Sequence, residues 1–202
     1  MATVLVIGTM DTKGRESAYL ASGIREHGCD ALVMDVGILG EPDEIHCDIS
    51  RAAVAEAAGT TLQALRRAGS RGKAVEGMRE GARSVVRRLA GEERIHGAVS
   101  LGGAEGAVLA SAAMRELPLG MPKTIVSPIA SGRRSFGPFV GTSDIAVVHS
   151  VVDICGLNAI ARQVFDTAAA SVAGGAISYE RAKQGSSGRP RRRQVAATML
   201  GN

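Results

Sequence analysis

The sequence alternates between short, continuous apolar runs and longer segments in which apolar residues recur every three or four positions. The apolar runs lie at residues 3–7, 31–36, 97–101, 123–126 and 143–148. Helical spacing is found at residues 15–26, 50–68, 71–90, 104–115 and 157–173. Continuous β-branched runs are typical of parallel strands covered on both faces. The alternation therefore predicts an α/β fold, with a parallel sheet, helices on both faces and right-handed crossovers.

In such sheets, ligands bind in the loops at the carboxyl ends of the strands. The glycine pair Gly102 and Gly103 is the central loop of this kind, because it turns the strand at 97–101 into a helix that begins near Ala104. The free N–H groups and the positive dipole end of that helix favour an anion, most commonly phosphate. Small residues at such a turn also serve close packing. The turn thus supports either a phosphate site or simple packing.

Three further loops offer polar groups at the same expected edge. Asp11, Thr12 and Lys13 provide an acceptor for magnesium or a hydroxyl, a hydroxyl donor, and a cation for phosphate. The alternative for these three residues is a helix cap followed by a solvated lysine. Residues 37–38 follow the second strand, where the ribose or base of a nucleotide commonly lies. Residues 142–144 add two hydroxyls and a carboxylate.

The segment 131–141 is rich in glycine, proline and arginine, and we predict that it is irregular and long enough to be functional. Arg133 and Arg134 are its candidate functional residues. Asp153 and Asn158 precede the last predicted helix, where capping explains them about as well as binding does.

No complete diagnostic motif accompanies these loops. The sequence has no G-x-x-x-x-G-K-[ST] phosphate loop, and no G-x-G-x-x-G follows the first strand. The four histidines lack metal-ligand spacing, and neither a Ser-His-Asp arrangement nor a G-x-S-x-G elbow is present. Because no general base is identified, the sequence leaves open whether the protein is an enzyme.

The distribution of charge argues against nucleic-acid binding. All 20 Asp and Glu residues and 18 of the 24 Lys and Arg residues lie at or before residue 180, so that part carries −2 although the whole chain carries +4. The positive excess lies in residues 181–193, which is typical of a solvated segment rather than of a specific RNA or DNA site. Aromatic residues make up 2% of the chain, so stacking platforms for bases are few.

Cysteine usage and the lack of long apolar runs indicate a cytoplasmic protein with reduced thiols. The chain has three cysteines, no C-x-x-C and no signal peptide. No apolar run approaches the roughly 20 residues that span a bilayer, so we expect no membrane contact. We predict a lobe at residues 1–180, a basic exposed linker at 181–193 and a strand at 194–202. Since a domain rarely ends on a buried strand, we expect the natural protein to continue beyond it.

Six stretches stand out together: VLVIGTMDTKGRE, VMDVG, SRGKAVEGM, GAVSLGGAEGA, MPKTIVSPIASG and GTSDIAVVHSVVDICGLNAIARQVF. As a set they resemble the ATP-binding domain family named after the tomato mosaic virus resistance protein, many of whose bacterial and fungal members are uncharacterised. The resemblance runs from about Val4 to the final QVAATMLGN, and its last block is the most specific. It implies a two-lobed protein of which this chain covers the first Rossmann-like lobe and, at 194–202, the first strand of a missing second lobe, with ATP held mostly by the first lobe. We expect Mg²⁺ to accompany the ATP.

The resemblance also implies a set of nucleotide contacts in this chain. They are Asp11, Thr12, Lys13, Ile38, Arg71, Gly103, Ala104, Glu105 and Gly106. Arg71 would pair with phosphate, although a surface charge at a helix start is the alternative. The family usually reads GLGGSGGT where this chain reads SLGGAEGA, so two hydroxyls are lost and a carboxylate appears at Glu105. We expect Glu105 to weaken ATP binding unless it points to solvent or reaches a cation.

Three functions stay open on the sequence alone. The first is a nucleotide-binding domain whose ligand is ATP. The second is one lobe of a small-molecule enzyme that acts on a phosphorylated or carboxylate substrate, with Asp11, Lys13, Arg71 and Arg134 as its polar set. The third is a truncated module that acts through protein contacts, with a second lobe or a second copy of itself.

Overall fold

The core of the protein is one parallel sheet, described here from a computed structural model that covers residues 1–131 and 137–186. Its strands are β1 (Thr3–Gly8), β2 (Asp30–Asp35), β3 (Gly97–Leu101), β4 (Lys123–Ser127) and β5 (Ala146–His149). They are arranged in the order β2-β1-β3-β4-β5. The predicted parallel sheet is therefore confirmed. The connection from β1 leads to one side of the sheet, to β2, and the chain then returns to the other side of β1, to β3. The gap between β1 and β3 is therefore the topological switch point.

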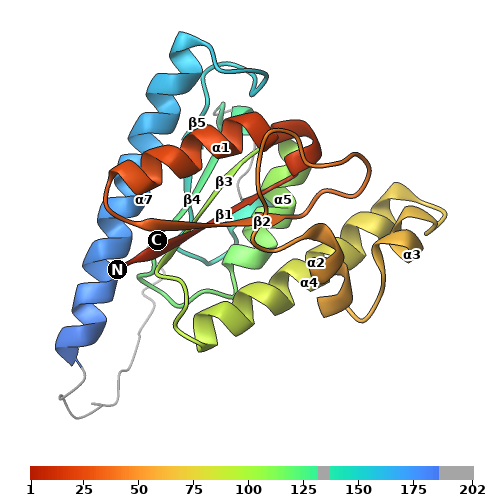
Figure 1. The fold of residues 1–202 in the computed structure, drawn as a ribbon, viewed down its shortest axis with the longest axis horizontal. Helices are drawn as coiled ribbons and strands as arrows, with labels where there is room; N and C mark the ends of the chain where they lie inside the picture. Colours follow the sequence, from red (N-terminus) through yellow and green to blue (C-terminus); the bar gives the residue numbers. More distant parts are fainter. Residues whose placement is uncertain (132–136, 187–202) are drawn as a thin grey trace, which may run out of the picture.

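Helices cover both faces of the sheet (Figure 1). The helices are α1 (Met10–Glu26), α2 (Arg51–Ala57), α3 (Leu62–Arg66), α4 (Arg71–Gly91), α5 (Ala104–Met114), α6 (Gly137–Val140) and α7 (Ala159–Ser186), with a 3-10 turn η1 (Pro128–Ala130) after β4. Helices α1 and α7 pack together on one face, whereas α2, α4 and α5 form the layer on the other. This arrangement is the predicted Rossmann-like α/β fold.

Strand β1 shows why the apolar runs are continuous. Leu5 and Ile7 belong to the core under α4 and α5, whereas Val4 and Val6 belong to the core under α1 and α7. All four side chains are fully buried. Burying a Val, Leu or Ile side chain contributes about 1.5–3 kcal/mol, so an apolar residue is favoured at each successive position.

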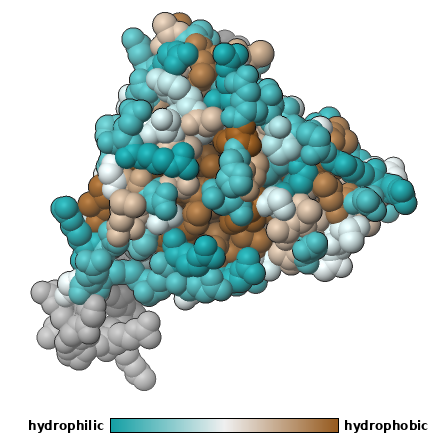
Figure 2. Space-filling view, viewed as in Figure 1, coloured by the Kyte–Doolittle hydropathy of each residue, from teal (hydrophilic) through white to brown (hydrophobic). Residues whose placement is uncertain are grey.

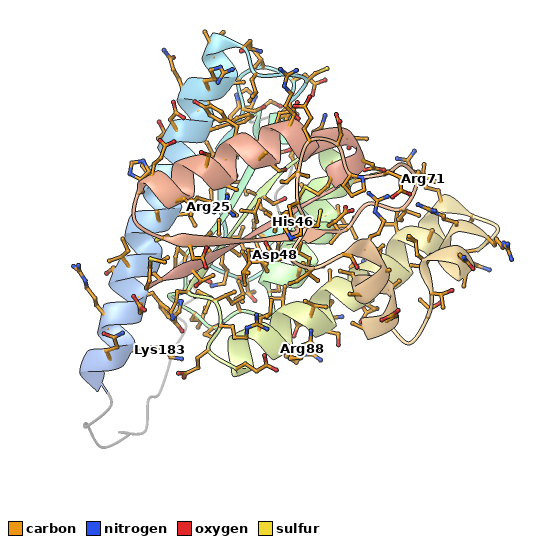
Figure 3. The ribbon with its side chains drawn as sticks, viewed as in Figure 1. Arg25, His46, Asp48, Arg71, Arg88 and Lys183 are labelled. Carbon is orange, nitrogen blue, oxygen red and sulfur yellow. The ribbon has the colours of Figure 1, made fainter. Side chains whose placement is uncertain are left out.

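The outer edge of β2 is covered by the chain segment that follows its loop. Ile49 forms a parallel bridge to Met34, and the Asp48 carboxylate accepts the N–H of Val33 at 2.8 Å. Asp48 lies against this strand in Figure 3. These two contacts fix both ends of the loop that carries residues 37–38. In Figure 2, hydrophobic residues gather in the middle of the surface that faces the viewer, between the mostly hydrophilic surfaces of α1 and α4.

Several predicted boundaries differ from those observed. Helix α1 begins at Met10, but Lys13 has non-helical backbone angles (φ −131°, ψ 18°). The predicted polar loop therefore forms one helical turn, and the continuous part of the helix begins close to the predicted residue 15. Helix α7 runs to Ser186 rather than ending near 173, because residues such as Ala176 continue its buried face. It therefore includes residues 181–186 of the predicted linker, and the remaining residues of that linker and the strand at 194–202 lie outside the described residues.

The region between β4 and β5 also differs in part. The segment 131–141, predicted to be irregular, includes the short helix α6 at its end, while Arg133 and Arg134 lie outside the described residues. Strand β5 begins at Ala146 rather than at residue 143. Within residues 1–131 and 137–186, no helix combines the length and hydropathy that crossing a membrane requires.

Candidate functional site

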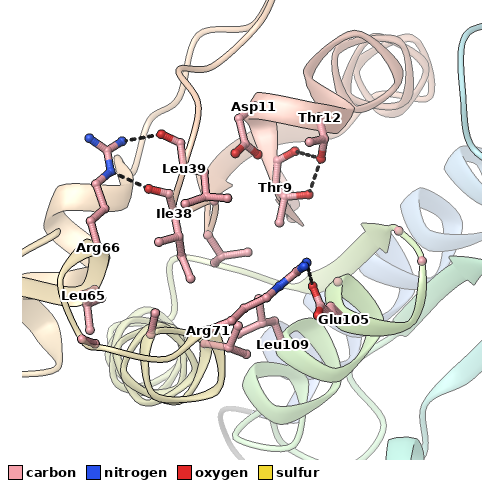
Figure 4. A pocket seen from close by; sticks show the side chains of 18 of the residues that line it. Thr9, Asp11, Thr12, Ile38, Leu39, Leu65, Arg66, Arg71, Glu105 and Leu109 are labelled. Carbon is pink, nitrogen blue, oxygen red and sulfur yellow. Dashed lines mark hydrogen bonds and ion pairs between the residues drawn. The ribbon is translucent and has the colours of Figure 1, made fainter. Parts of the chain in front are cut away.

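A cavity of about 830 Å³ lies beyond the carboxyl ends of β1, β2 and β3. It is bordered by the loops that leave these strands and by the first turns of α1, α4 and α5 (Figure 4). All nine residues expected to contact a nucleotide line it: Asp11, Thr12, Lys13, Ile38, Arg71, Gly103, Ala104, Glu105 and Gly106. The sequence segments that carry them are far apart, and the switch point of the sheet brings them together.

The two glycines before α5 have different roles. A Cβ atom at Gly102 would lie 3.3 Å from the Cα of Gly106, so Gly102 permits close packing of strand and helix. At Gly103 the Cβ position has no described atom within 4 Å, and the residue lines the cavity. Gly103 is also the N-cap of α5 and provides no side-chain cap. The first-turn N–H groups of α5 are therefore available to a ligand in the cavity.

The starts of α1 and α4 border the same cavity. The N-cap Thr9 makes no side-chain cap, and its hydroxyl lies 2.9 Å from the hydroxyl of Thr12. The N-cap Ser70 accepts the N–H of Lys73 and so begins α4 with a conventional cap. The positive dipole ends of α4 and α5 lie at the cavity and their fields add there, beside the first helical turn of α1, which is kinked at Lys13.

The Asp11 carboxylate has one oxygen in use and one free among the described residues. Its Oδ2 accepts the N–H of Gly40 at 3.0 Å. Its Oδ1 is buried and has no hydrogen-bond partner within residues 1–131 and 137–186. A Cβ atom at Gly37 would lie 2.9 Å from this Oδ1, so glycine is needed there for the close approach of the loop. Asp11 is thus held in place with a free acceptor.

Two cationic side chains at the cavity, those of Lys13 and Arg66, are engaged by backbone carbonyls. The Lys13 ammonium donates to the carbonyl of Ile154, in the loop before α7, instead of extending into the cavity. The Arg66 guanidinium donates to the carbonyls of Ile38 and Leu39 at 2.6 Å and 2.9 Å (Figure 4). Lys13 would have to leave its carbonyl to contact phosphate, and Arg66 holds the loop after β2 in place.

Arg71 and Glu105 form an ion pair that joins the start of α4 to the start of α5 (Figure 4). Both side chains are exposed, with relative accessibilities of 75% and 57%. Of the two ways in which Glu105 could avoid repelling a phosphate, the structure shows the second, contact with a cation. The same pair occupies the guanidinium that was expected to bind the ligand.

Asp35 and Arg51 are site-forming residues that were not predicted. Asp35 ends β2 and is fully buried, and its Oδ1 accepts the N–H groups of Met10 at 3.1 Å and Gly37 at 2.8 Å. Its Oδ2 lies 2.6 Å from the Nε of Arg51, which is itself buried. One carboxylate therefore fixes the two loops that form a wall of the cavity. A carboxylate inside the apolar run VMDV was the available signal.

Residues 142–144 are not at the cavity, contrary to expectation. They precede β5 instead of following a strand, and Asp144 lies 2.6 Å from the Lys123 ammonium at the start of β4. Burial opposes ionisation of Asp144, but hydrogen bonds from Lys123 and the N–H of Gly120 outweigh it and lower its pKa. This pair is at the amino edge of the sheet. Asn158 accepts an N–H in the first turn of α7, so capping accounts for it.

These observations define an α/β domain with a ligand-sized cavity at its topological switch point. The sequence matches the N-terminal domain of the uncharacterised protein family UPF0261 over residues 2–181, and the chain belongs to that family.

Similar proteins are found in bacteria and in tomato. A UPF0261 protein of Clostridium tetani is 39% identical over 171 residues, and one of Rhizobium meliloti is 37% identical over 172 residues; each match covers 85% of this chain and 42% of the relative. The ToMV susceptible protein tm-1(GCR26) of Solanum lycopersicum is 40% identical over 104 residues, which cover 52% of this chain and 14% of that protein. The chain thus spans less than half the length of these relatives.

Proposed function

We propose that this domain binds an adenine nucleotide, ATP with Mg²⁺, in the cavity at the carboxyl edge of the sheet. The observation that carries the proposal is the meeting of three helix starts, those of α1, α4 and α5, at one cavity. Helix N-termini bind phosphate through free N–H groups and through the helix dipole. Arg71 adds a guanidinium, the side chain best suited to phosphate oxygens.

The remaining walls suit the rest of a nucleotide. Apolar side chains also line the cavity and offer a surface for a base: Val36, Ile38, Leu65, Val75 and Leu109. The volume of about 830 Å³ is within the usual range of about 300–1,000 Å³ for small-molecule sites.

Asp11 suits a magnesium ion that arrives with the phosphates. Mg²⁺ is commonly bound by one or two carboxylates together with substrate phosphates and water, and Asp11 has a buried oxygen without a partner in the described part of the chain. Those same residues contain no group of three His, Cys, Asp or Glu side chains placed to hold a metal alone. A bound Mg²⁺ would neutralise phosphate charge. Asp11 would hold this Mg²⁺ ion through its carboxylate.

A partner surface belongs to the proposal as well. Since the chain spans 42% of its bacterial relatives, we propose that a second lobe or a second copy of the domain borders the open side of the cavity. The nucleotide would then lie between two surfaces and stabilise their association.

Isothermal titration calorimetry with ATP and Mg²⁺ tests the proposal. Arg71→Ala should weaken binding by about 1–3 kcal/mol, the range for a lost charge-assisted contact. Arg88→Ala is the matched control, because Arg88 is exposed on the same helix about 25 Å away (Figure 3). Equal affinities of the Arg71→Ala variant and the unmodified protein would contradict the site. Binding of sugar phosphates or organic acids without any binding of nucleotides would favour the small-molecule enzyme instead.

A further inference from the structure

We infer that Glu105 is a specificity-determining residue that lowers the preference of the cavity for nucleoside triphosphate over monophosphate. The inference rests on the proposed function and concerns the ligand class of the same cavity. It follows from the place that the Glu105 carboxylate occupies and from the partners of the neighbouring cations.

The Glu105 carboxylate occupies the position that a ligand anion would take. It is in the first turn of α5, where the helix dipole favours negative charge. It also pairs with Arg71 at the start of α4, so one protein carboxylate satisfies both anion-attracting groups (Figure 4). A phosphate that contacts Arg71 must therefore share the guanidinium with Glu105 or displace it.

Two other cations at the cavity are already engaged by carbonyl groups. Lys13 donates to the carbonyl of Ile154, and Arg66 donates to the carbonyls of the loop after β2. The field that acts on phosphate then depends mainly on the helix starts, on Arg67, which also lines the cavity, and on the Arg71–Glu105 pair, whose charges cancel. Because the pair is exposed, separating it costs little. Its carboxylate charge nevertheless stays close to the ligand.

Each additional negative charge on the phosphates is then repelled by the nearby Glu105 carboxylate. Coulomb repulsion at about 8 Å in a largely aqueous cleft corresponds to roughly a twofold to threefold loss of affinity for each added charge. From AMP to ATP the ligand gains two charges, so Glu105 should reduce the ATP-to-AMP affinity ratio by about fourfold to ninefold. Adenosine carries no charge and should be unaffected.

The test is to titrate adenosine, AMP, ADP and ATP, in EDTA and then with Mg²⁺, into the unmodified protein and the Glu105→Gln variant. The control is Glu92→Gln, which removes the same charge at the far end of α4, about 30 Å from Arg71. We expect Glu105→Gln to raise the ATP-to-AMP affinity ratio in EDTA by about fourfold to ninefold, with adenosine affinity unchanged and Glu92→Gln without effect.

The other outcomes separate this inference from the proposed function. The same ATP-to-AMP affinity ratio in the unmodified protein and in Glu105→Gln overturns the inference alone. An effect of Mg²⁺ on this ratio that is equal in the two proteins does so as well. An equal change in the Glu92→Gln variant overturns it too, because the effect would then come from net charge. If neither protein binds any adenine nucleotide, with or without Mg²⁺, the proposed function fails and the inference fails with it.

Discussion

Replacement of Asp35 by alanine tests whether one buried carboxylate holds the cavity wall together. The side chains of Asp35 and Arg51 are 0% and 5% exposed, and their charged atoms lie 2.6 Å apart. The variant leaves Arg51 as a buried cation without its carboxylate. It also removes the acceptor of the N–H groups of Met10 and Gly37. Both losses act on the folded state, so the free energy of unfolding should fall.

The expected loss is large compared with the total stability. Removing one partner of a buried ion pair typically costs about 3–5 kcal/mol, and a buried N–H without an acceptor costs about 1–3 kcal/mol. The terms overlap, so we expect about 4 kcal/mol for Asp35→Ala. Domains of this kind are stable by about 5–15 kcal/mol in all. Adding Arg51→Met removes the unpaired cation, so the double variant should lose at least 2 kcal/mol less than the sum of the single variants.

Urea denaturation followed by circular dichroism measures these losses. The control is the exposed pair formed by Arg71 and Glu105, where alanine at either position should change the free energy of unfolding by less than about 1 kcal/mol. A loss below 1 kcal/mol for Asp35→Ala would refute the reasoning. So would strictly additive losses for Asp35→Ala and Arg51→Met, because the two side chains would then not be coupled.

Two further predictions concern packing and pH. Gly14→Ala should lower the free energy of unfolding by about 3 kcal/mol, because its Cβ would lie 1.9 Å from the carbonyl oxygen of Asp43. The control Gly174→Ala is at an exposed position of α7 with open space around it and should raise the free energy of unfolding by about 0.5–1 kcal/mol. Similar urea midpoints for the two variants would contradict this reasoning. The pKa of Asp144 is lower in the folded protein than in the unfolded chain, so its stabilising contribution is complete above about pH 4 and is lost as the pH falls through the folded pKa. Asp144→Asn should therefore flatten the acid side of a stability profile measured from pH 6 to pH 2, and an unchanged profile would show that the pair with Lys123 contributes nothing.

The strands and the edge of the sheet that carries the cavity could be predicted from the sequence. Residues 4–7 of β1 are buried on both faces of the sheet, which favours an apolar residue at each position, and such a run is visible without coordinates. Once the strands are parallel, their carboxyl ends share one edge, which brings Asp11, Arg71 and Gly103 to the same cavity. The expectation for residues 142–144 was wrong because they precede β5 and therefore lie at the amino edge of the sheet.

Contacts between distant residues could not be predicted. The start of α1 is satisfied by the carboxylate of Asp35, which is 25 residues later in the chain, so no local capping pattern shows where the helix begins. The Lys13 ammonium donates to a carbonyl 141 residues away. The contact between Arg71 and Glu105 depends on the packing of α4 against α5. In each case the partner of a charged group is set by tertiary structure and leaves no periodic trace in the sequence.

The assembly of the cavity from separate stretches of chain has a thermodynamic consequence. Its walls come from residues 9–13, 36–39, 65–75 and 102–109, and these stretches come together only when the sheet is formed. A molecule that recognises the cavity then has no counterpart site on the denatured chain. Its binding energy adds directly to the stability of the native state, by about 2.7 kcal/mol at a free concentration one hundred times its dissociation constant. The melting temperature of the domain would therefore report occupancy for any compound, whatever its chemistry.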